Sequence, residues 1–124
     1  MRSIIEDVRA FHEALEIPVE AAPTVATRER RKLRSDLIGE EATETMIALE
    51  DPPDLVRIAD GLADLIYVCV GAALEFGIPL DRVWNEVHRS NMAKIGGPVR
   101  ADGKRLKPEG WRPPDIAGVL GIEG

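Results

Sequence analysis

The sequence predicts an all-α fold, a bundle of four to five helices followed by an irregular C-terminal arm. Two observations favour this class. Apolar residues recur at steps of three and four along four segments, and no alternating strand pattern of any length occurs. The chain has 124 residues, which suits one domain of modest core. We therefore expect a single domain over residues 1–124, with the bundle in 1–94 and the arm in 95–124.

Residues typical of helix boundaries delimit these segments. Ser3 and Thr27 stand where helices begin, and Gly77 suits a left-handed exit from a helix. Pro18, Pro23 and the run at 51–53 interrupt the helical pattern. The predicted helices cover residues 2–15, 27–49, about 53–76 and 80–92, with a short helical turn near 115–120.

Composition excludes several classes of function. The net charge of -6 disfavours general binding to nucleic acid. A single cysteine excludes an intrachain disulfide and a zinc ribbon with paired cysteines. The apolar run of the third helix, residues 62–74, is too short to span a bilayer, and charges interrupt the N-terminus where a signal peptide would be apolar. We expect a cytoplasmic protein with neither a nucleic-acid nor a membrane partner.

Acidic residues continue the apolar stripe of the second helix. Glu40, Glu41 and Glu44 follow Leu33 and Leu37 at helical spacing. Carboxylates directed toward a core repel one another and lose their hydration. A divalent metal is the simplest counter-charge.

The third helix adds two more acids. Asp64 is the only charge in the apolar run at 62–74, and Asp60 lies one turn earlier. The run is apolar on nearly every face, so we expect a central, mostly buried helix. Hard oxygen ligands from two helices predict a site for Mg²⁺, with Mn²⁺ as the alternative.

Two segments that contain several Lys and Arg residues are each open to two interpretations. The cluster at 28–34 is interpreted as a solvated face, with phosphate contact as the alternative. The arm at 96–114 is rich in glycine and proline, and a disordered tail is one interpretation. Trp111, Lys104 and Lys107 favour the other interpretation, an arm with an aromatic anchor that closes over an anionic ligand.

The residues Glu40-Glu41-Ala42-Thr43-Glu44 form an EExxE motif, and Asp64 follows on the next helix. Further motifs are Ser90-Asn91-Met92-Ala93-Lys94, Asp102-Gly103-Lys104 and Trp111-Arg112-Pro113-Pro114. In this order they resemble the all-α nucleoside triphosphate pyrophosphohydrolases, within them the MazG-like subgroup with dUTPase-type activity. The usual second signature is ExxD. Here Gly61 occupies the glutamate position, and the nearest acid is Asp60.

The resemblance implies Mg²⁺-dependent cleavage between the α- and β-phosphates of a nucleoside triphosphate, giving the monophosphate and pyrophosphate. It implies dUTP or another non-standard deoxynucleotide as substrate, in the house-cleaning of nucleotide pools. Glu41, Glu44 and Asp64 are the implied metal ligands, with Asp60 as a fourth. We favour Glu40, with Glu41 next, as the carboxylate that activates water.

We expect contacts to the substrate from both halves of the chain. Asn91 continues the stripe of Leu80, Trp84 and Val87, so it is predicted to face inward, although it and Lys94 also suit the end of a helix. The expected contacts are Asn91, Lys94, Tyr67, His88, Lys104, Lys107 and Trp111. His12, on the apolar face of the first helix, is expected to be a hydrogen-bonded core or rim residue.

Two other classes compete with the enzyme. A metal- and nucleotide-binding module without turnover is the main alternative, because Gly61 departs from the signature. A di-iron bundle is disfavoured, since neither acidic helix carries the Glu-x-x-His spacing. Helices this apolar would leave much surface exposed in a monomer, so we expect a homodimer, with a tetramer as the alternative.

Overall fold

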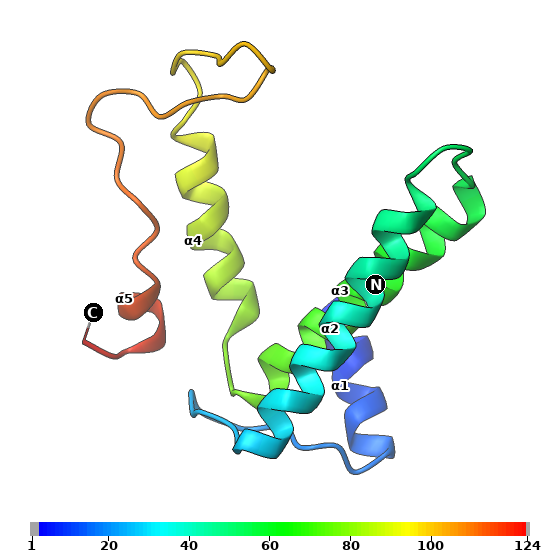
Figure 1. The fold of residues 1–124 in the computed structure, drawn as a ribbon. Coiled ribbons are helices and arrows are strands. Elements are labelled where there is room, and N and C mark those ends of the chain that lie inside the picture. Colours follow the sequence, from blue (N-terminus) through cyan, green and yellow to red (C-terminus); the bar gives the residue numbers. More distant parts are fainter. Residues whose placement is uncertain (1–2, 124) are drawn as a thin grey trace. The chain divides into compact units, whose positions relative to one another are not determined.

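The computed structural model describes residues 3–123, and within them the prediction of an all-α fold is confirmed (Figure 1). The helices are α1 (Ile4–Ala14), α2 (Arg28–Ala48), α3 (Leu55–Glu75), α4 (Leu80–Met92) and α5 (Ile116–Leu120). The chain divides into two compact units: the N-terminal unit ends at Ile78 and the C-terminal unit begins at Pro79. The organisation as one domain, with a bundle over 1–94, stays a prediction.

Side-chain caps explain where the helices begin. The Ser3 hydroxyl accepts a hydrogen bond from the Glu6 amide at 3.1 Å, and the Thr27 hydroxyl accepts one from the Arg30 amide at 3.3 Å. Gly77 has a φ of 62°, and a Cβ there would lie 2.1 Å from the carbonyl oxygen of Ala22. Only glycine fits both requirements, so α3 ends where the sequence predicts.

The N-terminal unit is built on a hairpin of α2 and α3, with α1 packed against α3 (Figure 1). The two long helices come very close at Gly61. A Cβ at this position would lie 2.6 Å from Thr45 Oγ1 and 3.3 Å from Thr45 Cα. The buried hydrophobic residues of this unit are Val8, Ala48, Val70, Ala73 and Leu74.

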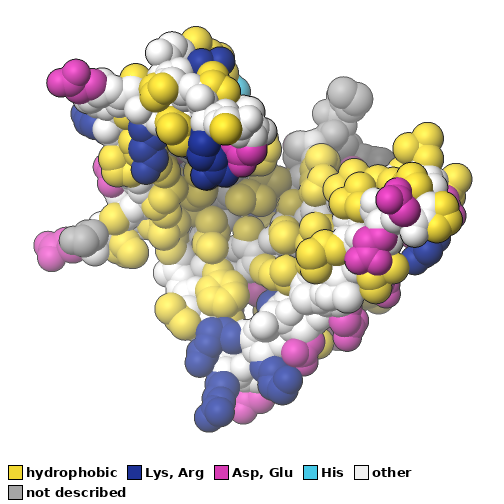
Figure 2. All heavy atoms as spheres, turned by 45° about the horizontal axis from the view of Figure 1, so that its top comes forward, with side chains coloured by type: hydrophobic (Ala, Val, Ile, Leu, Met, Phe, Trp, Pro, Cys, Tyr) yellow, Lys and Arg dark blue, Asp and Glu magenta, His cyan; other side chains and the backbone are white. Residues whose placement is uncertain are grey.

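The expectation that α3 is mostly buried is wrong for the single chain. Leu55 and Val56 are 80% and 79% exposed, and Leu62 and Ile66 are about half exposed. The reason is that α3 is apolar on nearly every face, whereas the helices packed on it within this unit, α1 and α2, cover only part of its surface. Figure 2 shows hydrophobic side chains widely exposed on the face in view. Among the described residues, no single helix is long and apolar enough to cross a membrane; only α3 and α4, taken together as a broken pair, meet that test.

In the C-terminal unit the arm is ordered and anchored to α4. Its tip is a turn in which the Arg100 amide donates to the Lys104 carbonyl at 2.8 Å. The indole Nε1 of the half-buried Trp111 donates to the Ser90 carbonyl at 2.6 Å. The prediction of an aromatic anchor is confirmed, and the alternative of a disordered tail is wrong.

Candidate active site

Five carboxylates gather on α2 and α3, and we call them the acid cluster: Glu40, Glu41, Glu44, Asp60 and Asp64. Glu41 is at its centre. One oxygen, Glu41 Oε2, is buried and has no hydrogen-bond partner among the described residues. Burial raises the pKa of Glu41, and repulsion from the four neighbouring carboxylates, Glu44 first, raises it further. The cluster therefore concentrates negative charge that no cation of the described chain compensates.

The expectation that Glu40, Glu41 and Glu44 all point toward a core is correct only for Glu41. Glu40 and Glu44 are exposed, as is Asp60, while Asp64 is half-buried. The reason is that α2 packs mainly against α3 in this unit, so the outer side of the stripe meets solvent. Exposed carboxylates are open to a hydrated cation and to a substrate that binds with it.

The chemistry of the acid cluster fits a hard divalent cation. All its donors are carboxylate oxygens, the ligands that Mg²⁺ and Mn²⁺ prefer, and the unpartnered oxygen of Glu41 supplies a group that a cation would satisfy. Among the described residues, no three His, Cys, Asp or Glu side chains stand at metal-binding distances.

Gly61 lacks the family's glutamate for a steric reason. A Cβ at Gly61 would overlap the Thr45 hydroxyl, so a glutamate at this position requires Thr45 or the pairing of α2 with α3 to shift. Asp60 lies on the exposed side of α3, free of this constraint. Its role as the replacement ligand stays a prediction.

A second charged group on the same hairpin was not predicted from the sequence. Arg34 Nε and Arg30 Nε both donate to the carboxylate of Glu75, the latter at 2.6 Å. The Glu75 side chain is 1% exposed and that of Arg34 is 8% exposed. The interpretation of the basic start of α2 as a solvated face is therefore wrong for these two arginines. The signal was Glu75 itself, a charge at the end of a long apolar helix.

His12 packs beside this ion-pair cluster. It is 2% exposed, and its Nδ1–H donates to the Pro18 carbonyl at 3.3 Å, so the prediction of a hydrogen-bonded core histidine is confirmed. Burial is the main cause that lowers the pKa of His12, and the nearby Arg34 adds to it. Gly71 makes room for both side chains, because a Cβ there would lie 2.7 Å from Arg34 Nη1 and 2.9 Å from His12 Nε2.

In the C-terminal unit, four of the predicted substrate contacts come together. The Nζ atoms of Lys94 and Lys107 lie 5.4 Å and 4.6 Å from the ring centroid of Trp111. Lys94 Nζ also donates to Asn91 Oδ1 at 3.1 Å. The prediction that Asn91 faces inward is wrong: Asn91 is exposed, because the stripe it continues is exposed, with Trp84 at 68%.

Three predicted contacts remain, namely Tyr67, His88 and Lys104. Tyr67, on α3, packs edge-to-face on Phe11 with ring centroids 5.6 Å apart. His88 and Lys104 are exposed, and their side chains have no hydrogen bond or ion pair with the described residues. Their roles toward a substrate stay predictions.

The all-helical fold and its family match define a relative of the MazG-like all-helical pyrophosphohydrolases. The chain belongs to the phosphoribosyl-ATP pyrophosphohydrolase family, whose model matches residues 8–91. The match includes the whole acid cluster and ends at Asn91. No curated protein matches the chain significantly. The family consists of hydrolases that act on phosphate anhydrides of nucleotides, and enzymes of this kind typically depend on a divalent metal.

Proposed function

We propose that the protein is a Mg²⁺-dependent nucleoside triphosphate pyrophosphohydrolase that cleaves between the α- and β-phosphates, with Mn²⁺ as the alternative metal. One observation carries the proposal. Glu41 holds a buried, unpartnered oxygen at the centre of four other carboxylates. Such an arrangement is costly without a cation, and a cation held partly by carboxylates completes its coordination with phosphate oxygens.

Each acid has a proposed role. Glu41, Glu44 and Asp64, with Asp60, would hold the metal, which when bound neutralises charge on the phosphates and aligns the anhydride. Glu40 is exposed and so can reach a water molecule, which it orients and deprotonates; Glu41 is the next choice. The water oxygen then forms a bond to phosphorus as the anhydride bond breaks, and the products are the monophosphate and pyrophosphate.

The C-terminal unit supplies the proposed contacts to the substrate. Asn91 can bond the sugar or base, and Lys94 and Lys107 can hold phosphates as point charges beside Trp111. The gathering of these side chains from the end of α4 and from the anchored arm supports this part of the proposal. Lys104, His88 and Tyr67 are further proposed contacts.

The substrate class distinguishes two forms of the proposal. Similarity to the dUTPase-like subgroup favours dUTP or another non-standard deoxynucleotide and a cytoplasmic role in cleaning nucleotide pools. The family match favours phosphoribosyl-ATP itself as the second candidate. Both substrates carry the same triphosphate, so the acid cluster serves either.

The test is a panel of nucleoside triphosphates, including dUTP and phosphoribosyl-ATP, assayed for pyrophosphate release with Mg²⁺. Release from at least one nucleotide, abolished by a chelator and by Glu41→Gln, is expected. The matched control is Glu109→Gln, which removes one exposed carboxylate outside the acid cluster. Nucleotide binding without any release would favour the alternative, a binding module that has lost turnover.

We further propose that the protein is a homodimer, with a tetramer as the alternative. The exposed apolar side chains of α3, Leu55, Val56, Leu62 and Ile66, support this assembly because a monomer would leave them in water. Sedimentation equilibrium measures the mass directly. A monomer at micromolar concentration contradicts the proposal.

A further inference from the structure

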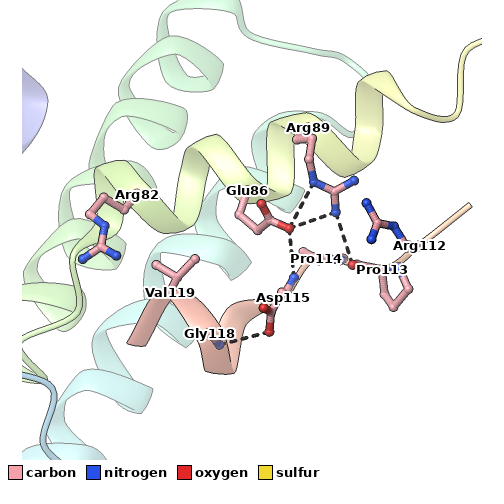
Figure 3. Close-up of a pocket in the computed structure, with 9 residues that line it drawn as sticks. All are labelled: Arg82, Glu86, Arg89, Arg112, Pro113, Pro114, Asp115, Gly118 and Val119. Atoms are coloured by element: carbon pink, nitrogen blue, oxygen red, sulfur yellow. Dashed lines mark hydrogen bonds and ion pairs between the residues drawn. The ribbon is translucent and has the colours of Figure 1, made fainter. Parts of the chain in front are cut away.

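The C-terminal unit contains a cavity of about 850 Å³ that belongs to neither the acid cluster nor the predicted substrate contacts (Figure 3). Arg82, Glu86 and Arg89 of α4 line one side, and Arg112 and Asp115 line the other. Cavities of this size hold small molecules. The question is what chemistry its walls select.

Both carboxylates of the cavity are already engaged. Glu86 Oε1 accepts hydrogen bonds from Arg89 Nη2 at 2.9 Å and from the Asp115 amide at 3.0 Å. Asp115 Oδ1 accepts one from the Gly118 amide at 3.0 Å. The bond from Arg89 is the main cause that lowers the pKa of Glu86, so this acid is ionised and fixed in place. Through these hydrogen bonds the two acids connect α4, the arm and α5.

Two of the three arginines are uncommitted. The guanidinium groups of Arg82 and Arg112 make no hydrogen bond or ion pair with the described residues, although the charge of Arg112 acts on Glu86 from a distance. Arg82 also lies in the first turn of α4, where a cation opposes the helix macrodipole, so helix stability does not explain it. Arg89 is held by Glu86 and by the Pro113 carbonyl at 3.3 Å. Three guanidinium groups against two engaged carboxylates leave the cavity positive.

We propose that this cavity binds a small organic phosphate without needing a divalent metal. Guanidinium groups match phosphate oxygens in geometry and charge, and Arg82 and Arg112 have these donors free. Pro113, Pro114 and Val119 add apolar wall against which the organic part of the ligand packs. The acid cluster, in contrast, repels anions until a cation is bound, so metal independence separates the two sites.

The test uses adenosine monophosphate as the probe, titrated calorimetrically into the full chain with excess chelator. Binding is expected for the wild type and absent for adenosine. The double variant Arg82→Gln/Arg112→Gln should weaken binding by about tenfold or more, the scale for losing charge-assisted hydrogen bonds. Arg57→Gln is the matched control, because Arg57 is an exposed arginine on α3 without a side-chain partner among the described residues. Circular dichroism checks that each variant is folded.

Three results would overturn the proposal. The first is no binding of adenosine monophosphate by the folded wild type. The second is equally tight binding of inorganic phosphate, which would show that the cavity does not recognise the organic part of the ligand. The third is a loss of binding in Lys94→Gln/Lys107→Gln with none in the arginine variant, which would place the phosphate beside Trp111 instead.

Discussion

The hairpin of α2 and α3 carries two groups of charged side chains. The charges of one group are compensated within the protein, and those of the other are not. At one end Arg30 and Arg34 close around Glu75, and every charge has a partner. Further along, five carboxylates stand together, and Glu41 keeps a buried oxygen without a partner. The same two helices thus hold a compensated cluster and an uncompensated one.

The difference separates a structural role from a functional one. A buried ion pair holds its members in one geometry and needs no further ligand. A cluster of like charges destabilises the fold through repulsion, and a bound ligand of opposite charge relieves it. Such a cluster therefore indicates a binding site. The ion-pair cluster therefore positions the hairpin, whereas we propose that the acid cluster binds a cation. Variants that remove a charge from either cluster test this comparison.

The largest effect on stability is expected at Glu75. Glu75→Gln should lower the free energy of unfolding by about 3–5 kcal/mol, because it leaves the buried Arg34 guanidinium without its counter-charge. Urea denaturation measures the change. The double variant Arg34→Met/Glu75→Leu should recover most of the loss, since it removes the two buried charges, and the Arg30 side chain, which is 32% exposed, remains in contact with water. A single variant as stable as the wild type contradicts the structural role.

Removal of a cluster acid should affect turnover and leave the fold intact. Glu41→Ala, Glu44→Ala or Asp64→Ala should each lower kcat/KM by roughly 10²–10³-fold, the scale for removing one preorganised electrostatic contact. The assay is pyrophosphate release at saturating Mg²⁺, with circular dichroism as the check on folding. Glu109→Gln serves as the control. An acid whose removal leaves activity unchanged does not belong to the site.

The close approach of α2 and α3 at Gly61, which lies within the acid cluster, gives a smaller effect. Gly61→Ala should destabilise the protein by about 1–3 kcal/mol, because its Cβ would overlap Thr45. Gly39→Ala is the matched control, since nothing lies within 4 Å of a Cβ there, and it should stabilise by roughly 0.5–1 kcal/mol. Equal effects of the two substitutions, by thermal unfolding, would contradict the close helix contact.

Local signals in the sequence predicted the helices well and the pairings between helices poorly. Ser3, Thr27 and Gly77 act within a few residues of themselves, so the predicted helix boundaries lie within two residues of the observed ones. The ion pair of Arg34 with Glu75 depends on the register of α2 against α3, which no local pattern encodes. Periodicity misjudged Asn91 because it shows which residues share a face, whereas packing decides whether that face is covered.

The smallest predicted effect is a pH dependence at His12. Its pKa is lowered in the folded state below the ordinary 6.5, so the unfolded chain takes up the proton first. Stability from this residue is full above pH 6.5 and is lost as the pH falls from there toward the lowered value. His12→Gln should flatten this part of the curve of unfolding free energy against pH. His88→Gln, at an exposed histidine, should leave the slope unchanged.

The most direct test of the acid cluster is a Mg²⁺ titration followed by thermal unfolding. We predict that the Tm of the wild type rises to a plateau with Mg²⁺, because the cation binds the folded state alone. Glu41→Gln should match or exceed the wild-type Tm without Mg²⁺, since repulsion is relieved, and should gain little when Mg²⁺ is added. Glu109→Gln should follow the wild type. A wild-type Tm that does not move with Mg²⁺ would contradict the claim that the acid cluster is completed by a divalent cation.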